Sequence, residues 1–272
     1  MENNSSKKNK RILLKTAAAL AGAFVVLAAA SFPMKTVYYT VHTDKISEAV
    51  RIAQVSDLHS CYYGKDMENL VSAIDKTSPD MVVLTGDIYD DSADSGNTCT
   101  FLDRIGRKYP CYYVMGNHEQ RNGSRDSFAR EAESFGIHVL DGENTDAFGI
   151  TLCGSGKNFS ASIEKCAEEA DTDKFNVLLA HYPEQIDYYR SFGKFDLILS
   201  GHAHGGQWRI PGILNGLYAP NQGLFPEYAG GRYDFDDSVM IVSRGLSRTK
   251  EIIPRIFNNP ELVIVDIVPW DS

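Results

Sequence analysis

Five short apolar runs, each followed directly by a short motif that contains Asp, Asn or His, constrain the fold of this chain most strongly. Runs of this length between turn or helix signals are typical of buried strands in an α/β sheet. Ligands of open α/β sheets bind just beyond the carboxyl ends of the strands, so these polar residues are expected to meet at one edge of one sheet. The runs are Val50–Ser56, Met81–Thr85, Cys111–Met115, Asn176–Ala180 and Phe195–Ser200.

The residues that follow these runs predict a metal site. Asp57 and His59 stand two positions apart, so their side chains fall on the same side of an extended segment. The same spacing would let His202 and His204 each serve a different ion of one pair. A single zinc site takes three or four protein ligands, whereas a larger donor set suits two ions that share a carboxylate. The donors are Asp57, His59, Asp87, Asn117, His181, His202 and His204.

The motif order resembles that of the calcineurin-like metallophosphoesterase superfamily, from about Val50 to the C-terminus. The motifs are Asp-x-His, Gly-Asp-x-x-Asp, Gly-Asn-His-Glu, His and Gly-His-x-His. Longer strings at 180–184, 200–207 and 223–228 are similar to those of membrane-anchored or exported bacterial phosphoesterases. Some members of that branch are UDP-2,3-diacylglucosamine pyrophosphatases. Other members of the superfamily have lost ligands and become scaffolds, whereas this chain keeps the full set.

The resemblance implies a dinuclear phosphohydrolase in which metal-bound hydroxide attacks a phosphoester or pyrophosphate, without a covalent enzyme intermediate. His118 would protonate the leaving oxygen or stabilise the transition state, since a histidine titrates near neutral pH. Asp90 would orient a ligand or His118 by a hydrogen bond, with a solvated acidic loop as the alternative. Mn²⁺, Fe and Zn²⁺ all suit such a donor set. The expected ligands are Asp57, His59, Asp87 and His204 for one ion, and Asp87, Asn117, His181 and His202 for the other.

Substrate-binding candidates follow the last ligands. Trp208 could stack on a base or cover an acyl chain, and the Arg209 guanidinium could pair with a phosphate. A packed hairpin rim with a solvated Arg is the simpler alternative. The stretch Gly212–Tyr233 is expected to form a long surface loop. Its apolar side chains would fit a lipid-bearing substrate or a membrane face, and equally a loop folded onto the core.

The first 35 residues resemble a targeting segment. Five basic side chains precede an apolar, Ala-rich stretch from Thr16 to Phe32, which predicts a signal anchor or a cleavable signal peptide with a site near Ala28-x-Ala30. The positive-inside rule then predicts a cytoplasmic tail and an extracytoplasmic domain. We therefore expect residues 1–35 to form a basic tail and membrane anchor, with secretion after cleavage as the alternative. Residues 36–272 would form the metallophosphoesterase domain.

The net charge and the cysteine content of the chain argue against some kinds of partner and site. The chain carries a net charge of −9, and the basic N-terminal segment leaves −14 on the remainder. Such an acidic domain is a poor nucleic-acid binder. The resemblance implies a phosphorylated small molecule or a lipid-linked compound as the substrate. Five cysteines without a Cys-x-x-Cys pair do not form a disulfide framework or a structural zinc site, and an odd number slightly favours a reducing environment.

The remaining pattern predicts a four-layer αββα sandwich of two mixed sheets flanked by helices. Later strands are strongly β-branched, at Val239–Ser243 and Leu262–Val268, and imply a second sheet. Ile137–Leu140 and Ala147–Cys153 flank a polar turn and are expected to form a hairpin. Apolar residues recur at helical spacing in Met67–Lys76, Thr100–Lys108, Ser127–Phe135, Ser160–Ala170 and Glu184–Ser191.

The predicted function is hydrolysis of a lipid-linked or cell-envelope phosphate compound. A broad-specificity phosphodiesterase acting on nucleotides or cell-wall phosphodiesters is the alternative. A non-catalytic scaffold with the same fold is a second, more remote alternative.

Overall fold

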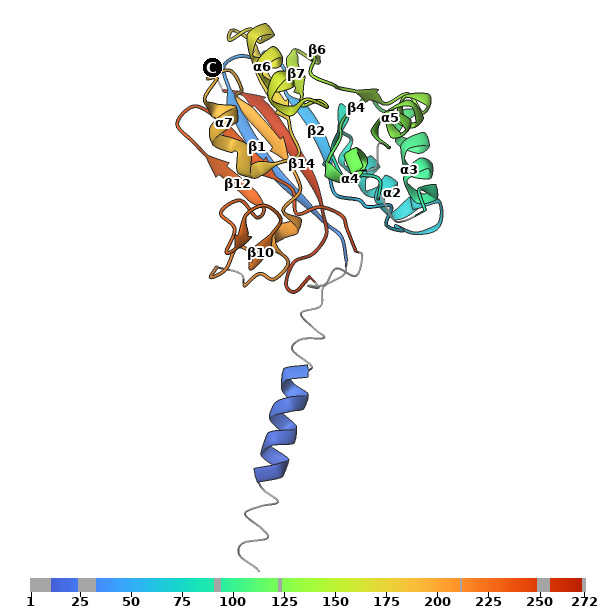
Figure 1. Ribbon diagram of the computed structural model, residues 1–272, viewed down its shortest axis with the longest axis vertical. Helices are drawn as coiled ribbons and strands as arrows, with labels where there is room; N and C mark the ends of the chain where they lie inside the picture. Colours follow the sequence, from blue (N-terminus) through green and yellow to red (C-terminus); the bar gives the residue numbers. More distant parts are fainter. Residues whose placement is uncertain are drawn as a thin grey trace, which may run out of the picture.

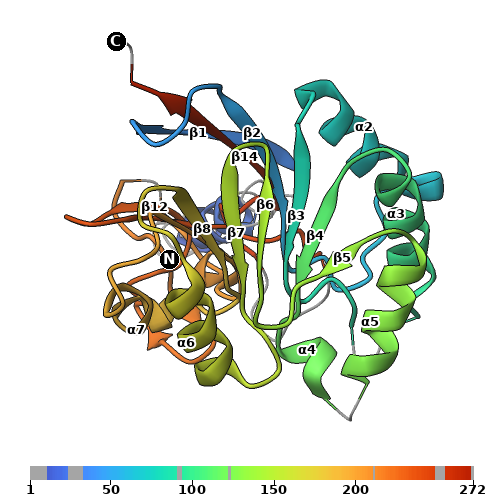
Figure 2. The same cartoon turned by 90° about the horizontal axis from the view of Figure 1, so that it is seen from above.

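The computed structural model describes residues 11–23, 33–90, 94–121, 124–210, 212–248 and 255–270. Two six-stranded mixed sheets form its centre (Figures 1 and 2). The first sheet contains, in spatial order, β1 (Lys35–Thr43), β14 (Glu261–Pro269), β2 (Val50–Val55), β3 (Met81–Thr85), β4 (Cys111–Val114) and β5 (His138–Val139). The second contains β12 (Gly231–Asp234), β13 (Val239–Val242), β9 (Leu197–Ser200), β8 (Phe175–Leu179), β7 (Ile150–Gly154) and β6 (Asn144–Ala147).

The two sheets pack face to face. Successive side chains of a strand point to opposite faces of its sheet, so every second side chain enters the core between the sheets. In β3, Met81 and Val83 enter the core between the sheets, whereas Val82 and Leu84 join the core on the opposite face. Phe175 and Val177 of β8 meet them from the second sheet. Each fully buried aliphatic side chain stabilises the fold by about 1.5–3 kcal/mol, so this alternation fixes the register of both sheets.

Helices cover the two outer faces. The helices α2, α3 and α5 pack on the first sheet, and α6 and α7 pack on the second (Figure 2). In α2, Leu70, Val71 and Ile74 lie on one face and are buried against the sheet. The predicted αββα sandwich is therefore confirmed. The helices are η1 (Lys65–Met67), α2 (Glu68–Thr77), α3 (Gly96–Gly106), α4 (Asn117–Gln120), α5 (Arg125–Ser134), α6 (Phe159–Glu169), η3 (Pro183–Gln185), α7 (Ile186–Arg190) and η4 (His204–Gly206).

One predicted hairpin is wrong. The run at 137–140 supplies β5, which pairs in parallel with β4 in the first sheet. The run at 147–153 supplies β7, whose hairpin partner is β6 in the second sheet. The turn between β6 and β7 is Phe148-Gly149, and both residues have positive φ. Two-residue turns of this kind usually carry Asn-Gly or Asp-Gly, so Phe148-Gly149 is a weak signal for the true hairpin.

The N-terminal segment is described only in part. Residues 11–23 are helical. The predicted anchor at 16–32 continues into residues 24–32, which lie outside the described residues. Within the described ranges, no helix combines the length and the apolar character needed to cross a membrane.

The predicted surface loop after the last ligands is only partly irregular. It contains a small two-stranded ribbon, β10 (Tyr218–Ala219) and β11 (Gly223–Leu224). Ile213, Leu224 and Phe225 are exposed, whereas Leu214 and Leu217 are half-buried. Part of the loop therefore folds back onto the domain, and part presents apolar side chains to solvent.

Candidate metal centre

The predicted donors meet where the carboxyl ends of strands from both sheets converge. Asp57 and Asp87 follow β2 and β3 in the first sheet, and Asn117 lies just beyond β4. His181 follows β8, and His202 follows β9, in the second sheet. The expectation that one sheet supplies every donor is therefore wrong, because the strands that precede the two groups belong to different sheets.

The turns that carry the donors have unusual backbone geometry. Asp57, His59, Asp87, His202 and His204 all have φ between 48° and 66°, the left-handed region that non-glycine residues rarely adopt. The segment with Asp57 and His59 is therefore not extended, although its two side chains still meet. Such strain persists only where surrounding contacts hold it, and it is common at functional sites.

A glycine makes the close approach of these turns possible. Gly86 has φ +93°, and a Cβ added there would lie 2.4 Å from Nδ1 of His181. That nitrogen lies 2.8 Å from the Thr85 carbonyl oxygen, which fixes the ring of His181. A larger residue at position 86 would therefore displace a predicted ligand.

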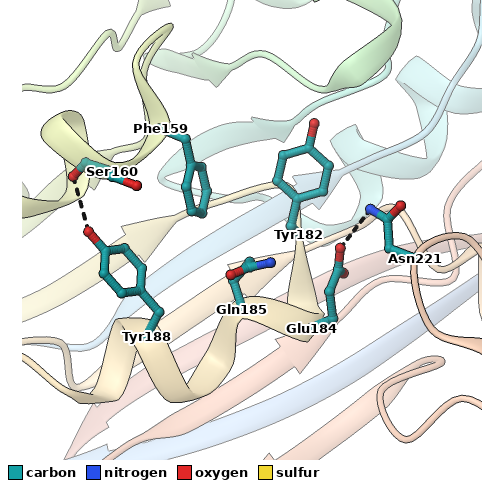
Figure 3. A pocket seen from close by; sticks show the side chains of 7 residues that line it. All are labelled: Phe159, Ser160, Tyr182, Glu184, Gln185, Tyr188 and Asn221. Carbon is teal, nitrogen blue, oxygen red and sulfur yellow. Dashed lines mark hydrogen bonds between the residues drawn. The ribbon is translucent and has the colours of Figure 1, made fainter.

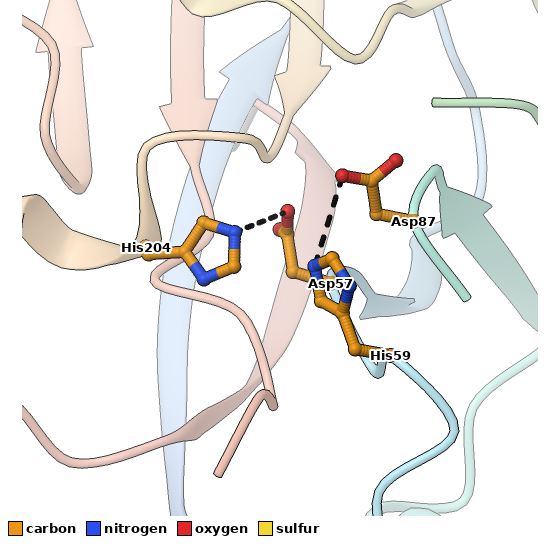
Figure 4. A group of neighbouring side chains, drawn as sticks. All are labelled: Asp57, His59, Asp87 and His204. Atoms are coloured by element: carbon orange, nitrogen blue, oxygen red, sulfur yellow. Dashed lines mark ion pairs between the residues drawn. The ribbon is translucent and has the colours of Figure 1, made fainter. Parts of the chain in front are cut away.

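The first cluster of donors consists of Asp57, His59, Asp87 and His204 (Figure 4). All four side chains are buried, and one donor atom from each lies within 4.8 Å of the others. His204 Nε2 lies 3.5 Å from Asp57 Oδ1, and His59 Nε2 lies 3.7 Å from Asp87 Oδ2. Both distances are longer than those of a normal N–H···O hydrogen bond.

A second cluster shares Asp87 with the first. It consists of Asp87, His181 and His202, again with donor atoms within 4.8 Å of one another. His181 Nε2 lies 3.3 Å from Asp87 Oδ2 and 3.1 Å from His202 Nδ1. The Asn117 Oδ1 atom lies 3.3 Å from the same His181 nitrogen. The structure thus brings all the predicted donors together around Asp87.

The chemistry of the clusters fits a divalent metal ion. The buried Nε2 atom of His59, a member of the first cluster, has no hydrogen-bond partner among the described residues. A buried nitrogen without a partner is free to bind a metal ion. Burial opposes the ionisation of Asp87, but His181 and His59 hold its pKa well below its usual range. Imidazole and carboxylate donors together suit Mn²⁺, Fe or Zn²⁺.

Comparison with known proteins decides the family. The model of the calcineurin-like phosphoesterase family matches residues 50–206, which include every predicted donor. The chain belongs to this family. Membership places it among the metal-dependent phosphoester hydrolases, in agreement with the resemblance that the motifs carry.

Relatives support the same family. An uncharacterized metallophosphoesterase of Helicobacter pylori is 29% identical over 61% of this chain, and this chain spans only 48% of that relative's length. The UDP-2,3-diacylglucosamine pyrophosphatase LpxG of Chlamydia muridarum is 25% identical, over 79% of this chain and 83% of its own length. The solved structure of TT1561 of Thermus thermophilus is similar in fold, with a TM-score of 0.50 and 13% identity over 71% of this chain and 88% of that chain.

Two further predicted residues lie against the clusters of this calcineurin-like phosphoesterase. Asp90 Oδ2 lies 3.3 Å from His59 Nδ1, the ring nitrogen opposite the one directed at the cluster. The His118 ring packs edge-on against His59 at a centroid distance of 4.5 Å, and the His118 backbone N–H donates to Asp87 Oδ1 at 2.9 Å. Asp90 is therefore placed to fix the orientation of His59.

Glu119 ties two of the turns together. Its buried carboxylate accepts hydrogen bonds from the backbone N–H groups of Asp87, Ile88, Tyr89 and Gly116, and from the Tyr113 hydroxyl. Glu119 therefore holds the turn that carries Asp87.

A cavity of about 300 Å³ opens beside the clusters, and sequence reasoning missed four of its lining residues, Arg121, Tyr182, Pro220 and Asn221. His118, His202 and His204 line it together with Arg121, Tyr182 and Asn221. The Arg121 Nη1 atom lies 3.4 Å from His118 Nε2. Arg121 and Tyr182 stand three and one positions after predicted site residues, so proximity in sequence was the signal that could have found them. Asn221 lies in the loop at Gly212–Tyr233, within which the sequence singled out no individual residue.

The predicted substrate residues Trp208 and Arg209 do not line this cavity. The Arg209 guanidinium donates to the Gly205 carbonyl oxygen and to the Asn215 side chain. Trp208 is 41% exposed. Arg209 is half-buried, so it is not the solvated side chain of the simpler alternative.

The two other histidines and the cysteines lie outside the clusters. His42 stacks on Trp270, and His138 Nε2 lies 2.9 Å from Glu143. No disulfide joins the cysteines within the described part of the chain.

Proposed function

We propose that the chain is a dinuclear metal-dependent hydrolase whose substrate is a phosphoester or pyrophosphate of a lipid-linked or cell-envelope compound. The observation that carries the proposal is the position of Asp87, which belongs to both donor clusters. A carboxylate shared by two adjacent donor sets is the arrangement that a two-metal phosphohydrolase requires.

The residues divide naturally between two ions. One ion would be held by Asp57, His59, Asp87 and His204, and the other by Asp87, Asn117, His181 and His202. Bound divalent ions would neutralise phosphate charge and acidify water at the site.

The other cavity residues would act on the substrate directly. His118 lines the cavity and would donate a proton to the leaving oxygen. Arg121 lines the same cavity, and its guanidinium would hold a non-bridging phosphate oxygen, for which its planar fork is suited. In a domain with a strongly negative net charge, this local positive charge would offset long-range repulsion of the substrate.

The substrate class rests on similarity and on the loop after the ligands. LpxG, the pyrophosphatase to which the chain is similar over most of its length, supports a lipid-linked pyrophosphate. The exposed apolar side chains of Ile213, Leu224 and Phe225 support the same class, because they would contact the acyl chains of a lipid-linked substrate. The alternatives are a phosphodiesterase of broad specificity and a scaffold without activity.

We also propose that the domain acts outside the cytoplasm, held at the membrane by the N-terminal segment or released from it. The support is the row of basic side chains ahead of the apolar stretch at 16–32.

The test of the function is hydrolysis by the full chain, stripped of metal and then supplied with Mn²⁺. Bis-p-nitrophenyl phosphate and p-nitrophenyl phosphate report diesterase and monoesterase activity. Turnover that appears only with metal supports the proposal. Bound metal without turnover on these esters points to a narrower substrate, to be tested with a lipid-linked pyrophosphate, and absence of both metal and turnover would support the scaffold.

A further inference from the structure

Exposed apolar side chains gather where two distant segments of the chain meet. Trp208 pairs with Ile256 in an isolated parallel bridge, so Phe257 is a near neighbour of Trp208. The Ile213 backbone N–H donates to the Ile210 carbonyl oxygen at 2.9 Å, so a tight turn brings these two residues together. The four exposed side chains of this surface, which we call the apolar face, are Trp208, Ile210, Ile213 and Phe257.

The apolar face is held rigidly against the metal centre. The side-chain amide of Asn258 is buried and donates to the carbonyl oxygens of His204 at 2.7 Å and Gln207 at 3.2 Å. The backbone N–H of Arg209 donates to the Ile256 carbonyl oxygen at 3.0 Å. The face is therefore a preformed surface, fixed to the backbone of a predicted metal ligand.

The chain enters the domain at the edge of the apolar face. Asn259, which follows the face, donates through its side-chain amide to the Pro33 carbonyl oxygen at 2.9 Å. The Lys35 backbone N–H donates to the Pro260 carbonyl oxygen at 2.9 Å. In the sequence, the apolar stretch at 16–32 ends directly before Pro33. A membrane anchor formed by that stretch would leave no spacer between the bilayer and this end of the domain.

The charge around the apolar face suits a surface of anionic lipids. The segments that form and border the face, 204–226 and 255–260, contain no Asp or Glu, although the domain as a whole is strongly acidic. They contain Arg209 and Arg255, and the exposed Lys35 begins the neighbouring strand β1. Basic side chains attract anionic head groups, and aromatic side chains favour the boundary between head groups and acyl chains.

A second aromatic surface near the metal centre lacks these features. A cavity of about 360 Å³ lies between the start of α6 and the segment of η3 and α7, and its wall includes Phe159, Tyr182, Tyr188 and Glu184 (Figure 3). The Glu184 carboxylate would repel an anionic head group, and none of the described residues that line the cavity is Lys or Arg. The apolar face is therefore the better match to a lipid surface.

We propose that the apolar face lies in the interfacial layer of a lipid bilayer. The inference rests on the proposed membrane location and deepens it, because it names the surface of the domain that touches lipid. The bilayer covers apolar side chains that water would otherwise surround, and Lys35 contacts anionic head groups. The metal centre, joined to the face through Asn258, then lies close to the membrane surface. A lipid-linked substrate would be embedded in the same bilayer.

The only two tryptophans of the chain supply a test with an internal control. Trp208 belongs to the apolar face, whereas Trp270 follows β14 and stacks on His42. β1 and β14 pair in parallel from Lys35, beside the face, to Thr43, beside Trp270. At about 3.3 Å per residue, roughly 27 Å separates the two ends of this strand pair. Lipid at the face should therefore reach Trp208 and not Trp270.

The experiment measures quenching of tryptophan emission by brominated lipid. The full chain is reconstituted into vesicles of phosphatidylcholine and phosphatidylglycerol, with or without bromine on the acyl chains near the head groups. Brominated lipid should reduce the emission of Trp270→Phe, which retains Trp208, by about half, because a face in the interfacial layer contacts the acyl chains. The emission of Trp208→Phe, which retains Trp270, should hardly change. Equal emission of Trp270→Phe in brominated and plain vesicles would overturn the proposal.

A charge placed in the apolar face tests the same contact. Ile213→Asp, made together with Trp270→Phe, should reduce the quenching of Trp208 by about twofold or more, because a carboxylate is costly to bury in lipid. The matched control is Phe148→Asp, at an exposed aromatic residue of the turn before β7. Circular dichroism of both variants confirms that they fold. Equal quenching in Ile213→Asp and Phe148→Asp would overturn the proposal.

The outcome is independent of hydrolysis, because quenching requires neither metal nor turnover. Flotation of the same vesicles tests the anchor separately. A chain that floats with the vesicles while Trp208 stays unquenched would overturn the lipid contact and keep the anchor, and a chain that does not float would overturn both. A dimer in solution that Ile213→Asp dissociates would also overturn the proposal, since a second copy of the chain would then cover the face.

Discussion

The Glu119 carboxylate accepts a hydrogen bond from the backbone N–H of Asp87 at 3.0 Å, although Glu119 lies in α4 and Asp87 lies in the turn after β3. The same carboxylate accepts from the backbone N–H of Gly116 at 2.8 Å. The turns after β3 and β4 are therefore fixed to each other by one buried side chain. Because Asp87 has a left-handed backbone, its position at the centre of both clusters depends on this contact.

Replacing Glu119 should therefore damage both stability and metal binding. Glu119→Gln places an amide NH₂ against backbone donors, and we expect it to lower the free energy of unfolding by about 3 kcal/mol. Denaturant unfolding and metal analysis of the purified variant would measure the two effects. Glu133→Gln, at an exposed position on α5, is the matched control. A loss no larger than that of the control would show that Glu119 does not hold the turn.

His118 should matter for rate and not for metal content. Its side chain lines the cavity, while its backbone N–H holds Asp87. Because a side-chain substitution keeps that N–H, His118→Ala should retain metal and lose about 10²–10⁴ in kcat. His138→Ala, which changes an exposed histidine of β5, should retain the wild-type rate. A wild-type rate for His118→Ala would remove His118 from the mechanism.

Metal affinity should rise with pH. Burial favours the neutral ring of His181, but the Asp87 carboxylate outweighs burial and raises the pKa of His181 to about 10 in the metal-free protein. A metal can bind only the deprotonated ring, so below pH 10 each binding event must displace a proton from His181. Burial and the charge of His181 lower the pKa of His202 to about 2, so His202 is neutral throughout the working range and adds no such dependence.

Calorimetry in two buffers of different ionisation enthalpy would count the protons released when Mn²⁺ binds. One proton from His181 corresponds to an affinity that rises about tenfold per pH unit between pH 6 and pH 9. Release of no proton in this range would show that His181 is not a ligand.

Export of the domain can be tested by a reporter. An enzyme that is active only outside the cytoplasm, fused after Ser272, should give signal because the basic residues before the apolar stretch favour the cytoplasmic side. Replacing Lys7, Lys8 and Lys10 with Glu should weaken the signal, whereas the same change at three exposed lysines of the domain should not. A silent fusion that is nevertheless present in cells would contradict the proposed location.

The sequence predicted the strands, and the meeting of the polar residues that follow them, for a physical reason. Buried strands such as β3 consist almost entirely of apolar residues, and a polar residue placed directly after one must lie at the sheet edge. The family motifs then supplied the roles of Asp87 and His118. This information is local, so it could be read without knowing the packing of the two sheets.

The parts that could not be predicted depend on contacts between distant segments. Asn221 reaches His202 from a loop with no periodic pattern, and Glu184 reaches Asn221 from another segment. Arg209, by contrast, stands close to the ligands in sequence but bonds within its own loop. Backbone strain in the turns also left no signal, because Asp and His are not residues that mark a left-handed conformation as strongly as Gly does.

The central claim is that Asp87 serves two metal ions, and the metal content of the purified full chain tests it most directly. We expect mass spectrometry of the wild-type chain, after equilibration with Mn²⁺ and removal of free metal, to give two ions per chain. Asp87→Asn should retain one ion at most, while Asp126→Asn, at an exposed position on α5, should retain both. A wild-type content of one ion or none, or an Asp87→Asn variant that keeps two, would contradict the account.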